Sequence, residues 1–360
     1  MSIHEIASDD IARTHEEAAA GEREPLLVLD PLLAFLDSAG LGTGEPEISP
    51  VGEGHSNVTY LFRRGEAEFV LRRPPRGPLP PSAHDVLREA RVLAALDGRA
   101  RVPKVLAVCD DEQLIGAPFY VMEKVDGHVI TTDVPDALDS VDDRRRIGEE
   151  LVDALVEVHA VDWQQAGLVG FGKPTGYLER QLRRFLGLWE HNRTREIRAV
   201  ESVGAWLADN MPESGPATIV HGDYRLGNAM YAPQAPARLN AIFDWEMSTI
   251  GDPKADLGYL CTLWTDRDDP PAGMFELTGV TREPGFPTRA ELVARYEQRS
   301  GRAMSDIRWY QTLALWKAIV FMEGNYRRAI AGATDDPFLK RFGDGVVELA
   351  ARAEELTRGG

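Results

Sequence analysis

The segment HGDYRLGN, residues 221–228, decides the interpretation of this 360-residue chain. It follows the apolar run ATIV and places the acidic residue Asp223 five positions before the amide residue Asn228. A carboxylate can orient a hydroxyl group and accept its proton, and an amide oxygen can bind a hard metal ion without adding negative charge. The spacing therefore predicts a loop at a strand end that holds a base and a metal ligand together.

A second apolar run, LNAIFDW, carries Asp244 to a strand end sixteen residues beyond Asn228. The order of base, amide and acid matches the kinase catalytic loop H-R-D-x-x-x-x-N followed by the aspartate of D-F-G. A single aspartate in a loop is more often a cap or a solvated turn residue, so the interpretation depends on the ordered combination. We predict that Asp223 is the catalytic base and that Asn228 and Asp244 bind magnesium, which needs only one or two protein carboxylates.

Two segments, HGDYRLGN (residues 221–228) and FDWEMSTIGDPKADLGY (residues 243–259), resemble the aminoglycoside and choline phosphotransferase family. This family is a small-molecule branch of the protein-kinase-like fold. The wording of the second motif is most similar to the subgroup related to the kinase-like domain of acyl-CoA dehydrogenase fusion proteins. The resemblance implies an α+β, two-lobed fold with a small antiparallel-sheet N-lobe and a larger, mainly helical C-lobe. It also implies ATP or another NTP and Mg²⁺ as cofactors, and an aminoglycoside, choline-like or hydroxyacyl compound as the hydroxyl acceptor.

Three residues near these motifs are expected to have structural roles. His221 matches the histidine that braces the catalytic loop, and a buried histidine bonded to the backbone is equally consistent with its position. In GDPKADLG, Asp252 can cap the helix that starts near Pro253, and Asp256 can tie the metal-binding loop to that helix.

The chain divides by its residue patterns. Residues 1–25 are polar and are expected to form a mobile tail, and residues 26–40 read as a helix capped by Asp30 with Pro31 at its first position. NVTYLF and EFVLRR predict an antiparallel hairpin, followed by an amphipathic helix and two more strands. We therefore expect a nucleotide-binding N-lobe over residues 26–125 and a C-lobe over residues 126–360 that holds the catalytic loop, the metal site and the acceptor site.

A glycine-bearing stretch, VGEGHSN, precedes the hairpin. Gly52 and Gly54 allow close approach of backbone N–H groups to phosphates, and Ser56 or Asn57 can add hydrogen-bond donors. Two glycines in a turn are weak evidence for phosphate binding, because an ordinary turn between strands needs no ligand. The position of this stretch directly before the hairpin favours phosphate binding.

FVLRR departs from the kinase pattern. Kinases carry a phosphate-contacting lysine on the third strand, and Arg72 stands at that position here. Glu89 on the following helix is its natural partner. The alternative is that Arg72 is an unrelated strand arginine and that Glu89 lies on a solvated helix face.

In YVMEKVDG, backbone groups near Glu123 and Val125 are expected to bind the purine.

Composition excludes several partner classes. With 58 acidic and 40 basic residues, the net charge of -18 opposes binding to nucleic acid or anionic membranes. The two cysteines, Cys109 and Cys261, suit neither a disulfide framework nor a metal site, which suggests a cytoplasmic protein. The sequence does not define the oligomeric state, and a homodimer is among the states that it allows.

The acceptor is the least defined part of the prediction. An acidic pocket would favour a cationic acceptor, whereas a hydroxyacyl acceptor calls for a basic or apolar pocket. We expect the acceptor to bind in a cleft near Asp223. The residues that could line this cleft are Trp245, Glu246, Trp264, Asp266, Tyr310, Trp316, Glu323 and Tyr326. The alternative for the aromatic residues is the hydrophobic core, because aromatic residues at helical spacing are usually buried there. Two alternatives stay open: a nucleotide-binding pseudokinase in which Arg72 has ended catalysis, and metal-assisted hydrolysis of a phosphate compound.

Overall fold

The computed structural model describes residues 10–52, 57–77, 84–270, 278–333 and 337–359. The chain divides into two compact units. Unit 1 contains the described residues up to Asp126 together with Ala241–Glu246, and unit 2 contains Gly127–Asn240 and the described residues from Met247 onward. The segment that carries Asp244 belongs to unit 1, and the lobe boundary after residue 125 stays a prediction.

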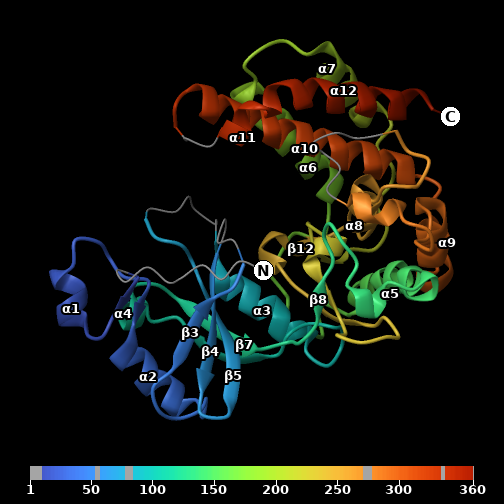
Figure 1. The fold of residues 1–360 in the computed structure, drawn as a ribbon. Coiled ribbons are helices and arrows are strands. Elements are labelled where there is room, and N and C mark those ends of the chain that lie inside the picture. Colours follow the sequence, from blue (N-terminus) through green and yellow to red (C-terminus); the bar gives the residue numbers. More distant parts are fainter. Residues whose placement is uncertain (1–9, 53–56, 78–83, 271–277, 334–336, 360) are drawn as a thin grey trace. The chain divides into compact units, whose positions relative to one another are not determined.

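Unit 1 is built on a five-stranded sheet in which all neighbouring strands are antiparallel, in the order β3-β4-β5-β7-β6 (Figure 1). The predicted hairpin is present as β4 and β5, and Phe62 stacks on its register partner Phe69 with ring centroids 5.5 Å apart. The strands are β3 (Glu47–Pro50), β4 (Val58–Arg64), β5 (Ala67–Arg73), β6 (Val105–Cys109) and β7 (Phe119–Glu123).

The amphipathic helix predicted after the hairpin is α3 (Val86–Leu96), which contacts β6 and β7. Asp85 caps it by accepting a hydrogen bond from the Arg88 N–H. The buried face of α3 includes Glu89, whose carboxylate is thereby turned toward the sheet. On the other side, α2 (Leu29–Ser38) and α4 (Glu112–Ile115) contribute to an apolar core that includes Leu32, Phe62 and Ile115.

The N-terminal region differs from the prediction. Part of the expected tail forms β1 (Ile11–Ala12), which pairs in parallel with β2 (Leu27–Val28), and α1 (His15–Ala20). The prediction that Asp30 caps the next helix is wrong, because β2 runs directly into that helix and Asp30 lies inside its first turn. Its carboxylate pairs instead with Arg13 at 2.6 Å.

Unit 2 is mainly helical, as predicted, and α10 is its central helix (Figure 1). α10 contacts α6, α7, α8 and α12 around an apolar core that includes Trp189, Trp316 and Ile319. The helices are α5 (Val141–Ala160), α6 (Tyr177–Asn192), α7 (Arg198–Asp209), α8 (Lys254–Leu263), α9 (Arg289–Ser300), α10 (Ile307–Ile330), α11 (Pro337–Lys340) and α12 (Phe342–Arg358).

Short strands and turns frame the motifs. β9 pairs antiparallel with β12, and a second small sheet has the order β11-β10-β8. These strands are β8 (His128–Val129), β9 (Thr218–Val220), β10 (Ala229–Tyr231), β11 (Leu239–Ile242) and β12 (Thr249–Gly251). Single 3₁₀ turns occur at η1 (Asp136–Leu138), η2 (Leu226–Asn228), η3 (Trp245–Met247) and η5 (Gly279–Arg282).

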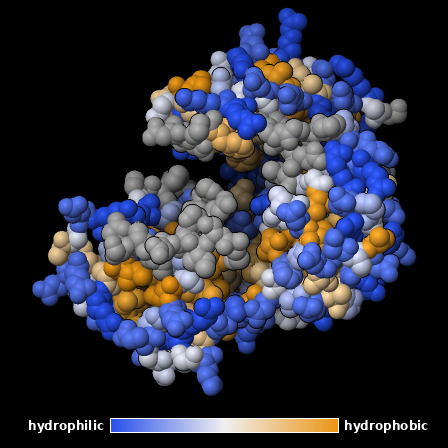
Figure 2. Space-filling model, viewed as in Figure 1, coloured by the Kyte–Doolittle hydropathy of each residue, from blue (hydrophilic) through white to orange (hydrophobic). Residues whose placement is uncertain are grey.

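Hydrophilic residues cover much of the face of the protein shown in Figure 2, in keeping with the high content of charged residues. Among the helices that the structure describes, none combines the length and the apolar character that a membrane span requires.

Candidate active site

The loop after β9 brings Asp223 and Asn228 together, as the spacing predicts. Asn228 lies in the 3₁₀ turn η2, and its Nδ2 donates to both the main-chain oxygen and Oδ2 of Asp223, each at 2.8 Å. Because Nδ2 faces Asp223, the amide oxygen is directed away from that carboxylate. An amide fixed in this orientation presents the oxygen that a hard cation would bind.

A buried carboxylate on α8 braces this loop. Asp256 accepts hydrogen bonds from the backbone N–H groups of His221 and Gly222, at 2.7 and 2.8 Å, and from Nε2 of His159 at 3.2 Å. Burial opposes the charge of Asp256, but these donors outweigh it and hold the pKa of Asp256 below its usual value. The expectation that Asp256 ties down the metal-binding loop is wrong, since its partners belong to the catalytic loop.

His159 in turn is held as a neutral ring. Burial lowers its pKa, and its Nδ1 lies 2.8 Å from the hydroxyl of Tyr296. A neutral imidazole that donates from Nε2 and accepts at Nδ1 satisfies both contacts. Asp252, the other carboxylate of this motif, accepts from the Lys254 N–H at the start of α8, in agreement with its predicted capping role.

Gly222 is required by the geometry of the loop. Its φ is +89°, and a Cβ atom there would lie 2.7 Å from the main-chain oxygen of Met247. The neighbouring His221 is fully buried and its Nδ1 accepts from the Asp223 N–H at 3.2 Å. This contact fits both predicted interpretations of His221, a brace for the catalytic loop and a buried histidine bonded to the backbone.

Two further side chains hold the Asp223 carboxylate. Tyr259 on α8 lies close to Asp223, and burial together with the Asp223 carboxylate raises the pKa of the Tyr259 phenol. Arg225 places Nε 3.5 Å from Oδ2 of Asp223. With Asn228 as a donor and Tyr259 and Arg225 beside it, Asp223 has a fixed orientation, which general-base catalysis requires. Sequence analysis missed Tyr259, although it closes the second motif.

A pocket of about 440 Å³ opens beside Asp223 within unit 2. Its walls are mainly apolar, and among the described residues the charged ones that line it are Asp223, Lys317 and Arg352. The apolar lining residues come from the turn before β12 and from α8, α10, α11 and α12, and include Met247, Leu263, Phe321, Met322, Phe338 and Phe342. The pocket is therefore suited to an apolar group placed next to the catalytic carboxylate.

The expected acceptor cleft is wrong in its residues. Trp264, Tyr310 and Trp316 are buried in the core, where the indole N–H groups of Trp264 and Trp316 donate to backbone carbonyls. Asp266 pairs with Arg289, and Glu323 binds Thr194. Aromatic residues at helical spacing fill the core here, as they usually do. The remaining candidates are Trp245 and Glu246, which belong to unit 1, and Tyr326, which packs under Arg195.

In unit 1, Arg72 on β5 joins two carboxylates. Its Nε donates to Oε2 of Glu89 and its Nη2 to Oδ1 of Asp244, both at 2.9 Å. Although burial opposes the charge, Glu89 and Asp244 raise the pKa of Arg72 above its ordinary value. The expected Arg72–Glu89 pair is thus present, and its contact with nucleotide phosphates stays a prediction.

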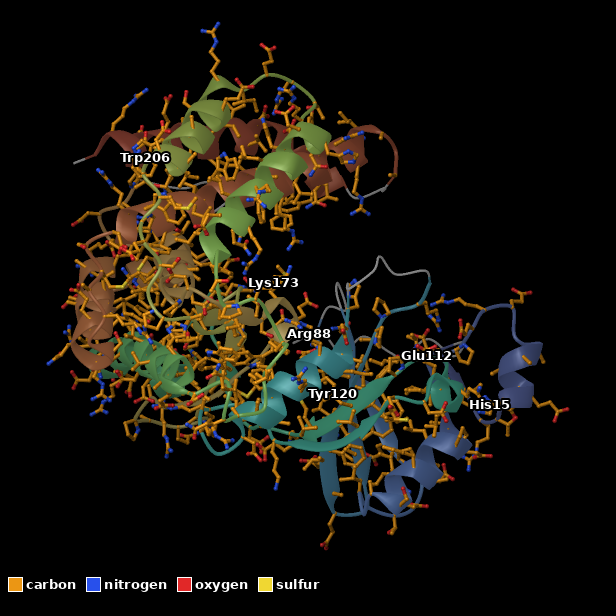
Figure 3. The ribbon with its side chains drawn as sticks, turned by 180° about the vertical axis from the view of Figure 1, so that it is seen from behind. His15, Arg88, Glu112, Tyr120, Lys173 and Trp206 are labelled. Atoms are coloured by element: carbon orange, nitrogen blue, oxygen red, sulfur yellow. The ribbon has the colours of Figure 1, made fainter. Side chains whose placement is uncertain are left out.

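The turn that carries Asp244 is fixed to α3. Asp244 has a left-handed backbone with φ of 65°, which is uncommon for a residue with a side chain. The next residue, Trp245, donates its N–H to Oε1 of Glu89 at 3.3 Å. Glu89 also interacts with the phenol of Tyr120, a β7 residue labelled in Figure 3. Burial raises the pKa of Glu89, and Arg72 offsets part of this effect.

The glycine-bearing stretch is only partly described. Gly52 has φ of +80°, consistent with its predicted turn, whereas Gly54 and Ser56 lie outside the described residues. Asn57 is buried, donates to Glu246 at 3.4 Å, and has an Oδ1 atom without a hydrogen-bond partner in the described structure. A buried polar atom normally has a hydrogen-bond partner, which can be a protein group, an ordered water or a ligand.

The predicted purine contacts lie in the segment after β7. The Glu123 N–H donates to the Lys104 carbonyl at 2.9 Å, and the Glu123 carboxylate accepts from the Lys104 N–H at 3.0 Å. The N–H of Glu123 is therefore engaged in the sheet. Val125 follows β7 and belongs to unit 1. Both purine contacts stay predictions.

The donor atoms suit magnesium. Asp244 offers a carboxylate that is 31% exposed, and Asn228 offers an amide oxygen. Magnesium prefers oxygen ligands and takes few of them from protein when phosphates and water complete its shell. Among the described residues there is no group of three or more His, Cys, Asp or Glu side chains arranged to hold a metal.

Comparison with known proteins agrees with this geometry. Residues 47–310 match the sequence profile of the phosphotransferase enzyme family. Acyl-CoA dehydrogenase family member 10 of Mus musculus is 33% identical over 316 residues, which cover 86% of this chain and 29% of that protein. This chain spans less than half the length of the curated relatives that it matches.

Two solved structures show the same fold. A Ralstonia eutropha protein assigned to the aminoglycoside phosphotransferases is 30% identical, with a TM-score of 0.81 and coverage of 92% of this chain and 98% of that one. Aminoglycoside 2'-phosphotransferase-IIIa, solved as a GDP complex, is 16% identical with a TM-score of 0.59, covering 89% of this chain and 97% of that one. At that identity the second likeness concerns the fold alone.

Proposed function

Because this chain belongs to the phosphotransferase enzyme family, we propose that it transfers the γ-phosphate of ATP to a hydroxyl group of a small molecule in a magnesium-dependent reaction. The observation that carries the proposal is the braced loop in which Nδ2 of Asn228 donates to the Asp223 carboxylate. A module that only binds nucleotide has little use for an oriented base of this kind.

In this reaction Asp223 orients the acceptor hydroxyl and accepts its proton at the carboxylate. Tyr259 and Asn228 hold the carboxylate in one orientation, and Asp256 holds the loop that carries it. Magnesium, when bound by Asn228 and Asp244, would neutralise charge on the phosphate oxygens.

Arg72 takes the part of the kinase lysine in this proposal. A guanidinium stays charged and can contact phosphate oxygens in pairs, and Glu89 fixes its position. Asn57 and the backbone around Gly52 are the proposed donors of the glycine-bearing stretch. Arg72 also binds Asp244, so this contact engages a proposed metal ligand. For this reason a nucleotide-binding pseudokinase is the second candidate function.

The pocket beside Asp223 supports an acceptor with an apolar body. Burying the charges of a polycationic amino sugar against Phe321, Phe338 and Met322 would cost free energy without compensation. Of the acceptor classes considered, the hydroxyacyl type suits these walls best. We place the reaction in the cytoplasm, where the two free, buried cysteines are chemically compatible with the reducing conditions.

Calorimetric titration of ATP with and without magnesium tests the proposal, followed by measurement of ADP release with candidate acceptors. We expect magnesium to strengthen ATP binding and one acceptor class to stimulate ADP release. Asp244→Asn should abolish most of the magnesium effect, and the exposed Asp209→Asn is the matched control. ATP binding without ADP release for any acceptor favours the pseudokinase, and ADP release without acceptor favours hydrolysis.

A further inference from the structure

A single lysine stands in the wall of the apolar pocket. Lys317 lies on α10 and is partly buried, and its Nζ is 4.9 Å from the centre of the Phe185 ring. Within the part of the chain that the structure describes, no carboxylate oxygen lies within 4.0 Å of this Nζ. The chain carries 18 more acidic than basic residues, so a partly buried cation without a carboxylate partner among the described residues is unexpected.

The two acidic residues that raise the pKa of Lys317, Asp256 and Asp223, are already engaged. Asp256 accepts from His221, Gly222 and His159. Asp223 is held by Asn228 and Tyr259. Neither carboxylate is therefore available as a close counterion for Lys317.

The environment of Lys317 disfavours its charge. Burial and the nearby Arg184 lower the pKa of Lys317 to about 8, while Asp256 and Asp223 act in the opposite sense. At neutral pH the amine is still mainly protonated. A buried cation normally has a partner, and contact with Phe185 supplies only part of the stabilisation that a carboxylate would give.

We propose that Lys317 determines acceptor specificity by binding an anionic group of the acceptor, so that the acceptor is an amphipathic alcohol with an apolar body and a negative charge. This inference rests on the proposed function, because it assigns the pocket beside Asp223 to the acceptor. Arg184, exposed on α6 with its guanidinium carbon 6.0 Å from the Phe185 ring, is a second cation at the same ring and strengthens the preference for an anion.

Binding of three matched alcohols tests the inference without any requirement for phosphotransfer. The probes are ω-hydroxyoctanoate, octanediol and aminooctanol, titrated calorimetrically into the full chain without nucleotide. We expect the wild type to bind the carboxylate about 10-fold more tightly than the diol, the size of one charge-assisted hydrogen bond, and the amine most weakly. A loss of this preference on Lys317→Met, with retention on Lys317→Arg, is the expected result.

Arg183→Met is the matched control, because Arg183 is an exposed cation next to Arg184 on the same helix, and it should keep the preference. Thermal melting checks that each variant is folded. The inference is overturned if the wild type binds none of the probes, binds the carboxylate and the diol equally, or prefers the amine. It is also overturned if Lys317→Met keeps the preference for the carboxylate over the diol. Failure of phosphotransfer alone would contradict the proposed function and leave this binding result standing.

Discussion

Nη2 of Arg72 lies 2.9 Å from Oδ1 of Asp244, and the same guanidinium binds Glu89 through Nε at 2.9 Å. One cation thus joins the helix glutamate to the proposed metal ligand. A lysine presents a compact charge from a single nitrogen, whereas the planar fork of arginine can hold two carboxylates at fixed angles. The exchange of lysine for arginine at this position therefore changes the geometry of the contacts and is not conservative.

Removal of Arg72 should destabilise unit 1. Arg72→Met leaves Glu89, which is only 2% exposed, without its main ion-pair partner, and we expect a loss of about 3 kcal/mol in the free energy of unfolding. Arg63→Met removes an exposed pair with Glu68 and should cost less than about 1 kcal/mol. Urea denaturation of both variants measures the difference. Equal losses would show that the Arg72–Glu89 pair has no special structural role.

The turn at Gly222 should not tolerate a side chain. Gly222→Ala introduces a Cβ atom 2.7 Å from the Met247 oxygen at a φ of +89°, and the loop must shift to relieve the contact. We expect a loss of about 1–3 kcal/mol in stability and a fall in phosphotransfer that exceeds the fall in the folded fraction. Gly215→Ala, where a Cβ atom meets nothing within 4 Å, is the control. Unchanged activity in Gly222→Ala would contradict the proposed role of the loop geometry.

The charge of Lys317 should make stability depend on pH. Its pKa is about 8 in the folded protein, against 10.5 for an unperturbed lysine side chain, so the unfolded chain binds more protons between these values. The folded state therefore gains stability from this residue as pH rises from about 8 to 10.5, by at most about 3 kcal/mol.

Lys317→Met removes this contribution. The stability advantage of the variant over the wild type should be largest below pH about 8 and should shrink as pH rises through that value. Denaturant unfolding at a series of pH values measures it. A constant difference across the series would show that burial does not depress the pKa of Lys317.

Much of this architecture follows from local signals. Alternating residues in NVTYLF and EFVLRR encode the hairpin. The spacing in HGDYRLGN favours the Asp223–Asn228 contact, since a tight turn brings residues five apart close together. The Arg72–Glu89 pair was also predictable, because a strand arginine and an inward-facing helix glutamate need each other when buried.

Other features depend on contacts between distant segments. Asp256 braces His221 across 35 residues, and no local pattern specifies which loop a helix carboxylate will reach. The acceptor prediction failed because helical spacing cannot distinguish core aromatics from pocket aromatics. Lys317 did carry a signal, a single lysine within the apolar run LALWKAIVF, but only the pocket around it shows the consequence.

The central claim is that Asp223 acts as the base for phosphotransfer, and Asp223→Asn tests it most directly. The substitution keeps the size and shape of the side chain and removes its charge and basicity. We predict that ATP-dependent phosphorylation of the acceptor found in the ADP-release screen falls by about 100- to 10,000-fold, while the dissociation constant for ATP with magnesium stays within about threefold of the wild-type value. A variant that keeps its phosphorylation rate to within about tenfold would contradict the account.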